Sequence, residues 1–94
     1  MIFTETSGRF APGRLLATPG VLKDVPRGDL FAAYHRHLNC DWGDLCEADK
    51  RENNVALKTG ERLLSAYHAK DDTKFWIITE ADRSATTVLL PKEY

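Results

Sequence analysis

The stretch that decides the fold is ITEADRSATTVLLP, residues 78–91, in which two runs of strand-forming residues flank a polar interruption. The first run extends back to Lys74 as KFWIITE, and the second is ATTVLL from Ala85 onward. β-Branched and aromatic residues favour strands, whereas the small and charged residues at 81–84 favour a turn. We therefore predict two neighbouring antiparallel strands joined by a short connection.

Two more strands are predicted around this pair. The segment RLLSAYHA, residues 62–69, has a similar composition, and the KDDT that follows it favours a hairpin loop. The three C-terminal segments thus predict an antiparallel meander, which Pro91 ends. Near the N-terminus, GRLLAT predicts a short strand at residues 14–17, which adds to one edge of the sheet.

Three helices are predicted between the first strand and the meander. Thr18 is a good N-cap for the first, and Pro19 suits the first helical position, where a missing N–H costs nothing. Asp29 is the expected cap of the second helix, residues 30–38, whose apolar residues share one broad arc. Asp44 is the expected cap of the third, and Gly60 its C-terminal stop.

The predicted architecture is α+β: a three- to four-stranded, mainly antiparallel sheet with helices packed on one face, in the order β-α-α-α-β-β-β. Residues 1–12 are expected to form an irregular N-terminal arm, and residues 13–94 a single domain. A chain of 94 residues has no room for a second hydrophobic core.

The third predicted helix has acids on its apolar arc, namely Asp49 and Glu52. A buried carboxylate needs a cation or several hydrogen-bond donors. Arg83, Arg62 or the backbone N–H groups of residues 80–84 are available partners. We therefore predict a structural clamp of Asp49, Glu52 and Arg83 that ties this helix to the strand corner.

Net charge and hydropathy indicate the cellular compartment and the kinds of partner to expect. The net charge of −1 offers little whole-molecule attraction for nucleic acid or anionic lipid. The N-terminus has no basic and apolar leader, and no later segment approaches a membrane-spanning length. These features predict a cytoplasmic protein without a membrane partner, in which Cys40 and Cys46 are reduced thiols.

Catalytic and metal-binding patterns are weak. His35, His37, Cys40 and Cys46 have suitable chemistry, but the histidines are two residues apart and point to different sides of a helix. His37 is expected in the core and His35 at its rim. No cysteine or serine lies in a nucleophile motif, and the glycines are dispersed. We predict no enzyme activity, no metal site and no cofactor.

The segment CDWGDLCEAD, residues 40–49, has acids around a tryptophan. Acids also favour the start of a helix, so charge capping accounts for much of this pattern. The functional alternative is a protein-binding patch for a basic partner, formed by Asp41, Trp42, Asp44 and Glu47. Glu80 and Asp82 form a second acidic tip, which is equally consistent with a turn.

Nucleic acid and a second copy of the chain are two other possible partners. Basic residues are scattered among acids, and this argues against direct nucleic-acid binding. A homodimer that completes the sheet edge is a further possibility.

The segments DWGDLCEADKRENNVALKTGERLLSAY, residues 41–67, and FWIITEADRSATTVLLPKEY, residues 75–94, resemble a family of short, uncharacterised plasmid-related proteins. These occur on bacterial plasmids and integrative elements. GRLLATPGVL, residues 13–22, is a weaker similarity, and the arm before Gly13 lies outside the pattern.

This resemblance implies a context rather than an active site. Small accessory proteins of mobile elements often inhibit host defences such as restriction or CRISPR systems by binding a defence protein. The resemblance therefore implies a non-enzymatic inhibitor of anti-CRISPR or antirestriction type, whose partner is a host protein or nucleoprotein complex with a basic surface. The alternative is a nucleic-acid-associated plasmid maintenance factor.

Overall fold

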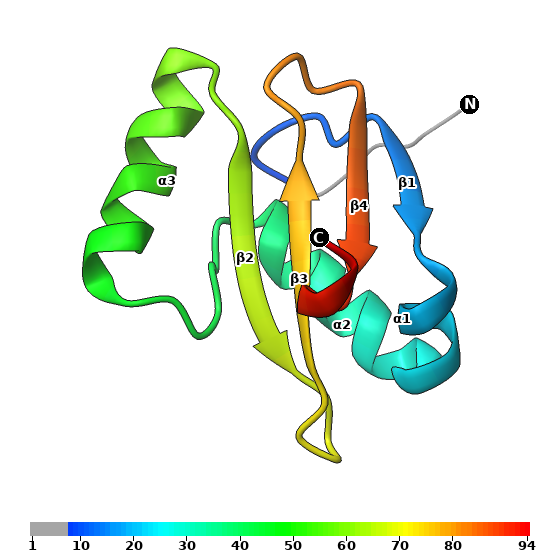
Figure 1. Ribbon diagram of the computed structural model, residues 1–94. Helices are drawn as coiled ribbons and strands as arrows, with labels where there is room; N and C mark the ends of the chain where they lie inside the picture. The colour runs from blue at the N-terminus through cyan, green and yellow to red at the C-terminus, as the bar shows by residue number, and fades with distance from the viewer. Residues whose placement is uncertain (1–7) are drawn as a thin grey trace.

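In the computed structural model, which describes residues 8–94, helices and strands follow one another in the predicted order (Figure 1). They are β1 (Arg14–Ala17), α1 (Pro19–Asp24), α2 (Arg27–Leu38), α3 (Glu47–Thr59), β2 (Leu63–His68), β3 (Lys74–Thr79), β4 (Ala85–Leu89) and the 3-10 helix η1 (Pro91–Glu93). The α+β class is confirmed. Residues 1–7 of the predicted arm lie outside the described residues.

The four strands form one mixed sheet in the order β1-β4-β3-β2. β2, β3 and β4 form the predicted antiparallel meander, and β1 adds to its edge beside β4. The pairing of β1 with β4 is parallel, so the sheet is not antiparallel throughout. A parallel neighbour requires a crossover, which here contains all three α-helices and the other two strands.

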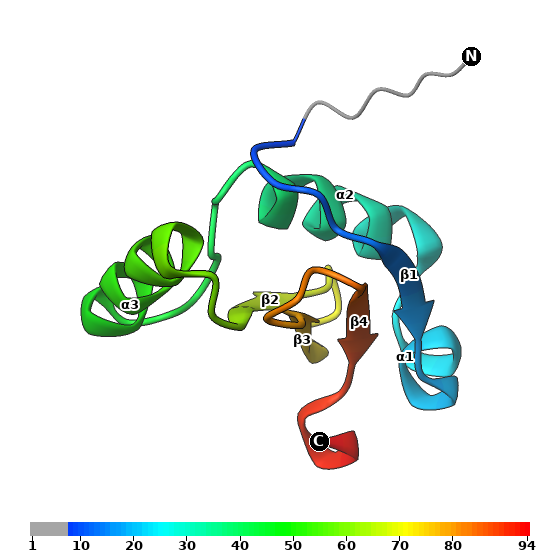
Figure 2. The ribbon, with the colours of Figure 1, turned by 90° about the horizontal axis from the view of Figure 1, so that it is seen from above.

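The two faces of the sheet have different surroundings. α1 and α2 pack on the face that carries Tyr67, Phe75, Ile77 and Val88, where the main core lies. The opposite face, hereafter the open face, is approached by η1 and the C-terminus (Figure 2). By strand register, the open face consists of Arg14, Leu16, Leu64, Ala66, His68, Lys74, Trp76, Ile78, Ala85, Thr87 and Leu89.

The start of α1 follows the sequence prediction and has an added tertiary contact. Thr18 is the N-cap, its hydroxyl oxygen accepts from the Val21 amide, and Pro19 is the first helical residue. The Thr18 hydroxyl also donates to Glu93 Oε1 at 2.5 Å, and the Gly20 amide donates to Glu93 Oε2 at 3.0 Å. A carboxylate at a helix N-terminus is electrostatically favourable, so Glu93 ties the C-terminal segment to α1.

Two predicted helix caps are wrong. α2 begins at Arg27 after Pro26, so Asp29 lies inside its first turn and accepts a hydrogen bond from the Lys70 amide at 3.0 Å. α3 begins after Cys46, and the Asp44 carboxylate is 2.6 Å from His68 Nδ1 instead. Both carboxylates are used by residues distant in sequence, which local capping patterns do not register.

The predicted inward face of α3 is also wrong, because Asp49 and Glu52 are exposed. The buried residues of α3 are Asn53 and Ala56. Asn53 Nδ2 donates to the Leu64 carbonyl at 2.6 Å, and Asn53 Oδ1 accepts from the Leu64 amide at 3.2 Å. The helix therefore faces the backbone edge of β2, where an amide that both donates and accepts suits better than a carboxylate.

A clamp does join α3 to the strand corner, but its acceptors are carbonyls. The Arg83 guanidinium donates to the carbonyl of Glu61 at 2.8 Å, that of Glu80 at 3.1 Å and that of Ala56 at 3.3 Å. Ala56 belongs to the end of α3, which Gly60 terminates with a φ of 80°, as predicted. Through these carbonyls, Arg83 links the end of α3 to the segment that follows it and to the β3–β4 connection.

We expect Arg83→Ala to lower the free energy of unfolding by about 2 kcal/mol, because hydrogen bonds from a charged donor to these carbonyls are lost. Asp49→Ala is the matched control and is expected to stay within about 0.5 kcal/mol of the wild type, since Asp49 is exposed. Urea unfolding of both variants measures this difference. Equal unfolding midpoints would show that the Arg83 contacts contribute nothing to stability.

Candidate functional site

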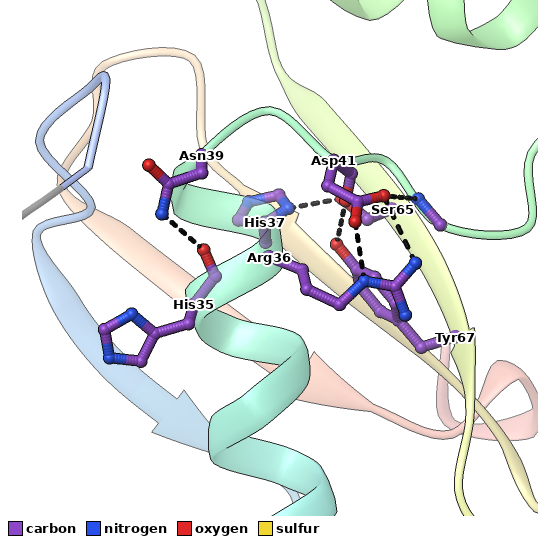
Figure 3. A network of polar contacts seen from close by, with 8 residues as sticks. His35, Arg36, His37, Asn39, Asp41, Ser65 and Tyr67 are labelled. Atoms are coloured by element: carbon purple, nitrogen blue, oxygen red, sulfur yellow. Dashed lines mark hydrogen bonds and ion pairs between the residues drawn. The ribbon is translucent and has the colours of Figure 1, made fainter.

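A chain of buried polar side chains runs from α2 across one face of the sheet, and Figure 3 shows its contact between His37 and Ser65. His37 Nδ1 contacts Ser65 Oγ on β2, and His37 Nε2 is 2.8 Å from Thr79 Oγ1 on β3. Thr79 Oγ1 is in turn 2.8 Å from Thr86 Oγ1 on β4. The Thr86 hydroxyl donates to the Pro12 carbonyl at 2.7 Å.

The last link fixes the direction of each hydrogen bond as far as His37 Nε2. The Pro12 carbonyl can only accept, so Thr86 donates to it and must accept from Thr79. Thr79 then accepts from His37 Nε2–H, so Nε2 carries a proton. Burial favours the neutral ring, in which Nδ1 accepts from the Ser65 hydroxyl.

This arrangement differs from a nucleophile–base pair in two respects. Ser65 and His37 resemble a nucleophile and its base, but both side chains are 0% exposed. The group that follows His37 is a threonine hydroxyl, which does not stabilise an imidazolium as a carboxylate does. Burial lowers the pKa of His37 to about 3, with a smaller contribution from the Arg83 charge. His37 thus lies in the core, where the sequence placed it.

At the end of α2, the predicted patch residue Asp41 is already paired. Its carboxylate accepts from Arg36 Nε at 2.7 Å and from a second Arg36 nitrogen at 3.2 Å, and this pairing holds the pKa of Asp41 below its usual value (Figure 3). The Arg36 guanidinium also lies 5.0 Å from the Tyr67 ring centroid. Tyr67 donates its hydroxyl to the Asp41 carbonyl at 2.6 Å.

Trp42 is not a surface anchor, because its side chain is only 3% exposed. The indole N–H donates to Asn54 Oδ1 at 3.0 Å, and the ring packs against Ala56 and Leu63. Gly43 forms a bridge with Ala66 on β2, which turns the preceding tryptophan inward. At Gly43 the φ is +76°, and an added Cβ would overlap the Ala66 carbonyl oxygen. The prediction of an exposed tryptophan is therefore wrong.

The remaining acids of the predicted patch also have basic neighbours. Asp44 lies beside His68, and Glu47 Oε2 is 3.5 Å from Lys50 Nζ. Asp41 and Glu47 are thus ion-paired, whereas Asp44 is paired with a charge only when His68 is protonated. Whether Asp41, Asp44 or Glu47 touches a partner stays a prediction.

A second acidic surface runs along α3, from Asp49 in its first turn to Glu61 just beyond its end. A cleft of about 300 Å³ separates α3 from β2, and Asp49, Glu52 and Glu61 are among its lining residues. The strand corner adjoins this cleft, because Arg83 bonds the carbonyls of both Glu61 and Glu80. We call this surface the acidic corner; it comprises Asp49, Glu52, Glu61, Glu80 and Asp82. Within residues 8–94, none of its carboxylates forms an ion pair.

The open face carries a separate aromatic cluster. Trp76 on β3 meets Tyr94 in an edge-to-face arrangement with 5.7 Å between ring centroids. The Arg62 guanidinium lies 5.4 Å from the Tyr94 ring centroid, and Arg62 also donates to the Tyr94 hydroxyl at 2.6 Å. Tyr94 is 64% exposed. The cluster therefore presents an aromatic surface beside a cation.

The candidate metal ligands are not brought together. His35 and Cys46 are exposed at different helix ends, whereas both nitrogens of His37 are already in hydrogen bonds. Across residues 8–94, no three histidine, cysteine or acidic side chains are close enough to share a metal ion. No helix in that range has the length and apolar character needed to cross a bilayer.

Comparison with known proteins returned no relative: no family model matches the chain, and no curated protein or solved structure is significantly similar to it.

The sequence predicted some residues of the acidic corner as a functional surface, but not Glu61. Glu80 and Asp82 were singled out, but Glu61 was not, because it follows Gly60 in what looks like an ordinary helix end. The available signal was the position of Glu61, an acid directly between the helix stop at Gly60 and the following strand. The partners of His37 had no local signal, since Ser65, Thr79 and Thr86 are ordinary strand residues.

We expect the wild-type protein to lose about 2 kcal/mol of unfolding free energy between about pH 7 and pH 5 through His37 alone. The unfolded imidazole binds a proton below about pH 6.5, whereas the native one does not until about pH 3, so stability falls as pH falls.

Chemical denaturation across this pH range measures the effect. His37→Gln should be less stable at neutral pH, because its amide does not reproduce the imidazole geometry, but it should show a flatter pH dependence. His35→Gln, an exposed position on the same helix, should keep the wild-type slope. A wild-type slope in His37→Gln would contradict a buried neutral imidazole.

Proposed function

We propose that this chain is a non-enzymatic protein-binding domain whose acidic corner occupies a basic surface of a host nucleic-acid defence complex. The observation that carries the proposal is the acidic corner itself: three of its carboxylates, Asp49, Glu52 and Glu61, line a cleft, and none of the five forms an ion pair within residues 8–94. Such a surface attracts a basic partner by charge and speeds their encounter.

The cleft adds specificity to this attraction, because its shape and lining favour one kind of side chain. Asp49, Glu52 and Glu61 line it together with the apolar side chains of Leu45 and Leu64 and with Arg62, whose guanidinium donates to the Tyr94 hydroxyl. A lysine or arginine of a partner fits such a site, because its aliphatic stem packs on apolar walls while its charge meets carboxylates. The volume of about 300 Å³ is at the lower end of the range for ligand pockets.

Hydrogen bonds hold the acidic corner in place, and its carboxylates remain without ion pairs within residues 8–94. Asn53 fixes α3 to β2, and Arg83 fixes the end of α3 to the β3–β4 connection. In that connection, Asp82 Oδ1 accepts from the Ser84 amide at 3.0 Å. A rigid surface loses less conformational entropy on binding, which favours tight association.

The assignment to host defence rests on the resemblance to plasmid-related proteins. Defence complexes that handle nucleic acid expose basic grooves, and an acidic protein surface can compete with a phosphate backbone for them. Stoichiometric inhibition of this kind needs no catalytic residue.

We expect Glu52→Lys/Glu61→Lys to weaken binding and inhibition of the target complex by about tenfold or more, because two attractions become repulsions. The matched control is Asp24→Lys/Glu47→Lys, which makes the same change in net charge at exposed positions outside the acidic corner.

The assay uses purified restriction and CRISPR effector complexes, with cleavage and complex formation measured for the three proteins. Inhibition that is lost only with the acidic-corner variant supports the proposal. Equal loss in both variants would point to net charge alone, and loss only in the control would move the interface to the start of α3. Failure to bind any such complex would remove the defence assignment.

A second candidate function is single-stranded nucleic-acid binding, and the open face favours it. Trp76, Tyr94 and Arg62 combine two aromatic rings with a cation, which is the combination on which nucleobases stack. Lys74 lies on the same face of β3. This candidate corresponds to the maintenance factor considered from the sequence.

If the open face binds nucleic acid, a single-stranded oligonucleotide should quench tryptophan fluorescence, and Tyr94→Ala should weaken binding roughly fivefold or more by removing one stacking partner. Raising the salt concentration should weaken binding steeply. Phe31→Ala is the matched control, since Phe31 is an exposed aromatic residue on α2. An unchanged fluorescence signal at low salt would exclude this function.

A further inference from the structure

The backbone of β1 has hydrogen-bonding groups that point away from the sheet. The Arg14 amide donates to the Ser84 carbonyl at 3.0 Å, and the Thr18 amide donates to the Val88 carbonyl at 3.0 Å. Because successive residues of a strand direct their backbone groups to opposite sides, the intervening Leu15 and Ala17 present theirs outward. β1 is the edge strand, and within residues 8–94 no other strand pairs with this side.

The opposite edge of the sheet is closed by the chain itself. On β2, Leu64 bonds through both backbone groups to the Asn53 side chain. The Ala66 amide donates to the Trp42 carbonyl at 3.3 Å, and the Ala66 carbonyl accepts from the Asp44 amide at 2.7 Å. The β1 edge has no equivalent cover in the described part of the chain.

β1 exposes apolar side chains, which favour contact with another strand over contact with solvent. Leu15 is 36% exposed and Leu16 is 38% exposed, on opposite faces of the sheet. No charge or proline interrupts residues 15–17, although edge strands are usually protected by such residues.

We propose that a second copy of this chain pairs with β1 in antiparallel orientation about a two-fold axis, with Leu16 opposite Leu16. In this register Leu15 of each copy lies opposite Ala17 of the other. Their outward amide and carbonyl groups then form reciprocal hydrogen bonds, and Leu16 occupies the non-hydrogen-bonded position, where side chains approach most closely.

The charges at the ends of β1 favour a second copy over an unrelated strand. The register places Arg14 of one copy opposite Thr18 of the other, on the same face as Leu16. The Thr18 hydroxyl is bonded to the Glu93 carboxylate at 2.5 Å, so Arg14 of each copy meets Glu93 of its mate. The two exposed Arg14 side chains lie at opposite ends of the interface and do not repel each other.

The dimer joins two four-stranded sheets into one, with both open faces on the same side. The interface is short, so we expect a monomer–dimer equilibrium that depends on concentration rather than an obligate dimer.

The test uses the pairing of Leu16 with itself. Sedimentation velocity and native mass spectrometry are run on the wild type, on Leu16→Lys, on Leu16→Glu and on an equimolar mixture of these two variants. We expect each variant alone to dimerise at least about tenfold more weakly than the wild type, because like charges face each other. The mixture should form a heterodimer, because lysine then faces glutamate.

Arg14→Glu is the second variant, because it sets a carboxylate against Glu93 and should also weaken the dimer. Circular dichroism checks that every variant is folded. A wild-type protein that stays monomeric up to about 1 mM overturns the proposal. A dimer that survives in Leu16→Lys, or a mixture that forms no heterodimer, overturns the proposed register. Capture of a foreign strand by a monomeric wild type also counts against a second copy.

Discussion

The requirement that the buried His37 imidazole stay neutral and fully hydrogen-bonded is the constraint on which the rest of the domain depends. Ser65, Thr79 and Thr86 meet this requirement from three neighbouring strands, and the Pro12 carbonyl ends the chain of donors. An unpaired polar group at this depth costs more than a paired one contributes. α2, the meander and the segment before β1 are therefore fixed relative to one another by one line of hydrogen bonds.

The two edges of the sheet differ, because α3 closes the edge at β2 whereas the edge at β1 has no paired strand in the described residues. This difference determines which surfaces are available for binding. α3 does not cover a face; its Asn53 satisfies the outer edge of β2, and this turns Asp49 and Glu52 outward. Arg83 holds the end of α3 beside the strand corner, and its charge is used on carbonyls. Within residues 8–94, the same packing that closes one edge leaves the carboxylates of the acidic corner without ion pairs and leaves the outer edge of β1 without a paired strand.

Local signals predicted most of the elements. The bounds of β1, the Thr18 cap, the position of Pro19 and the stop at Gly60 all depend on φ preference or on hydrogen bonds within a few residues, and all are confirmed. The caps Asp29 and Asp44 failed for one physical reason. Each carboxylate instead contacts a residue more than twenty positions away, Lys70 and His68 respectively, which a local pattern does not register.

The sequence by itself determined the α+β class, the meander and the burial of His37, because strand propensity, turn chemistry and helical periodicity act over short distances. Only the tertiary structure decided which acids remain free, because a carboxylate is neutralised by whatever base the fold brings beside it. It also decided that β1 lies parallel to β4, that Trp42 turns inward, and that Arg83 bonds carbonyls rather than Asp49. These outcomes depend on contacts between residues far apart in the chain, which periodicity along the sequence does not encode.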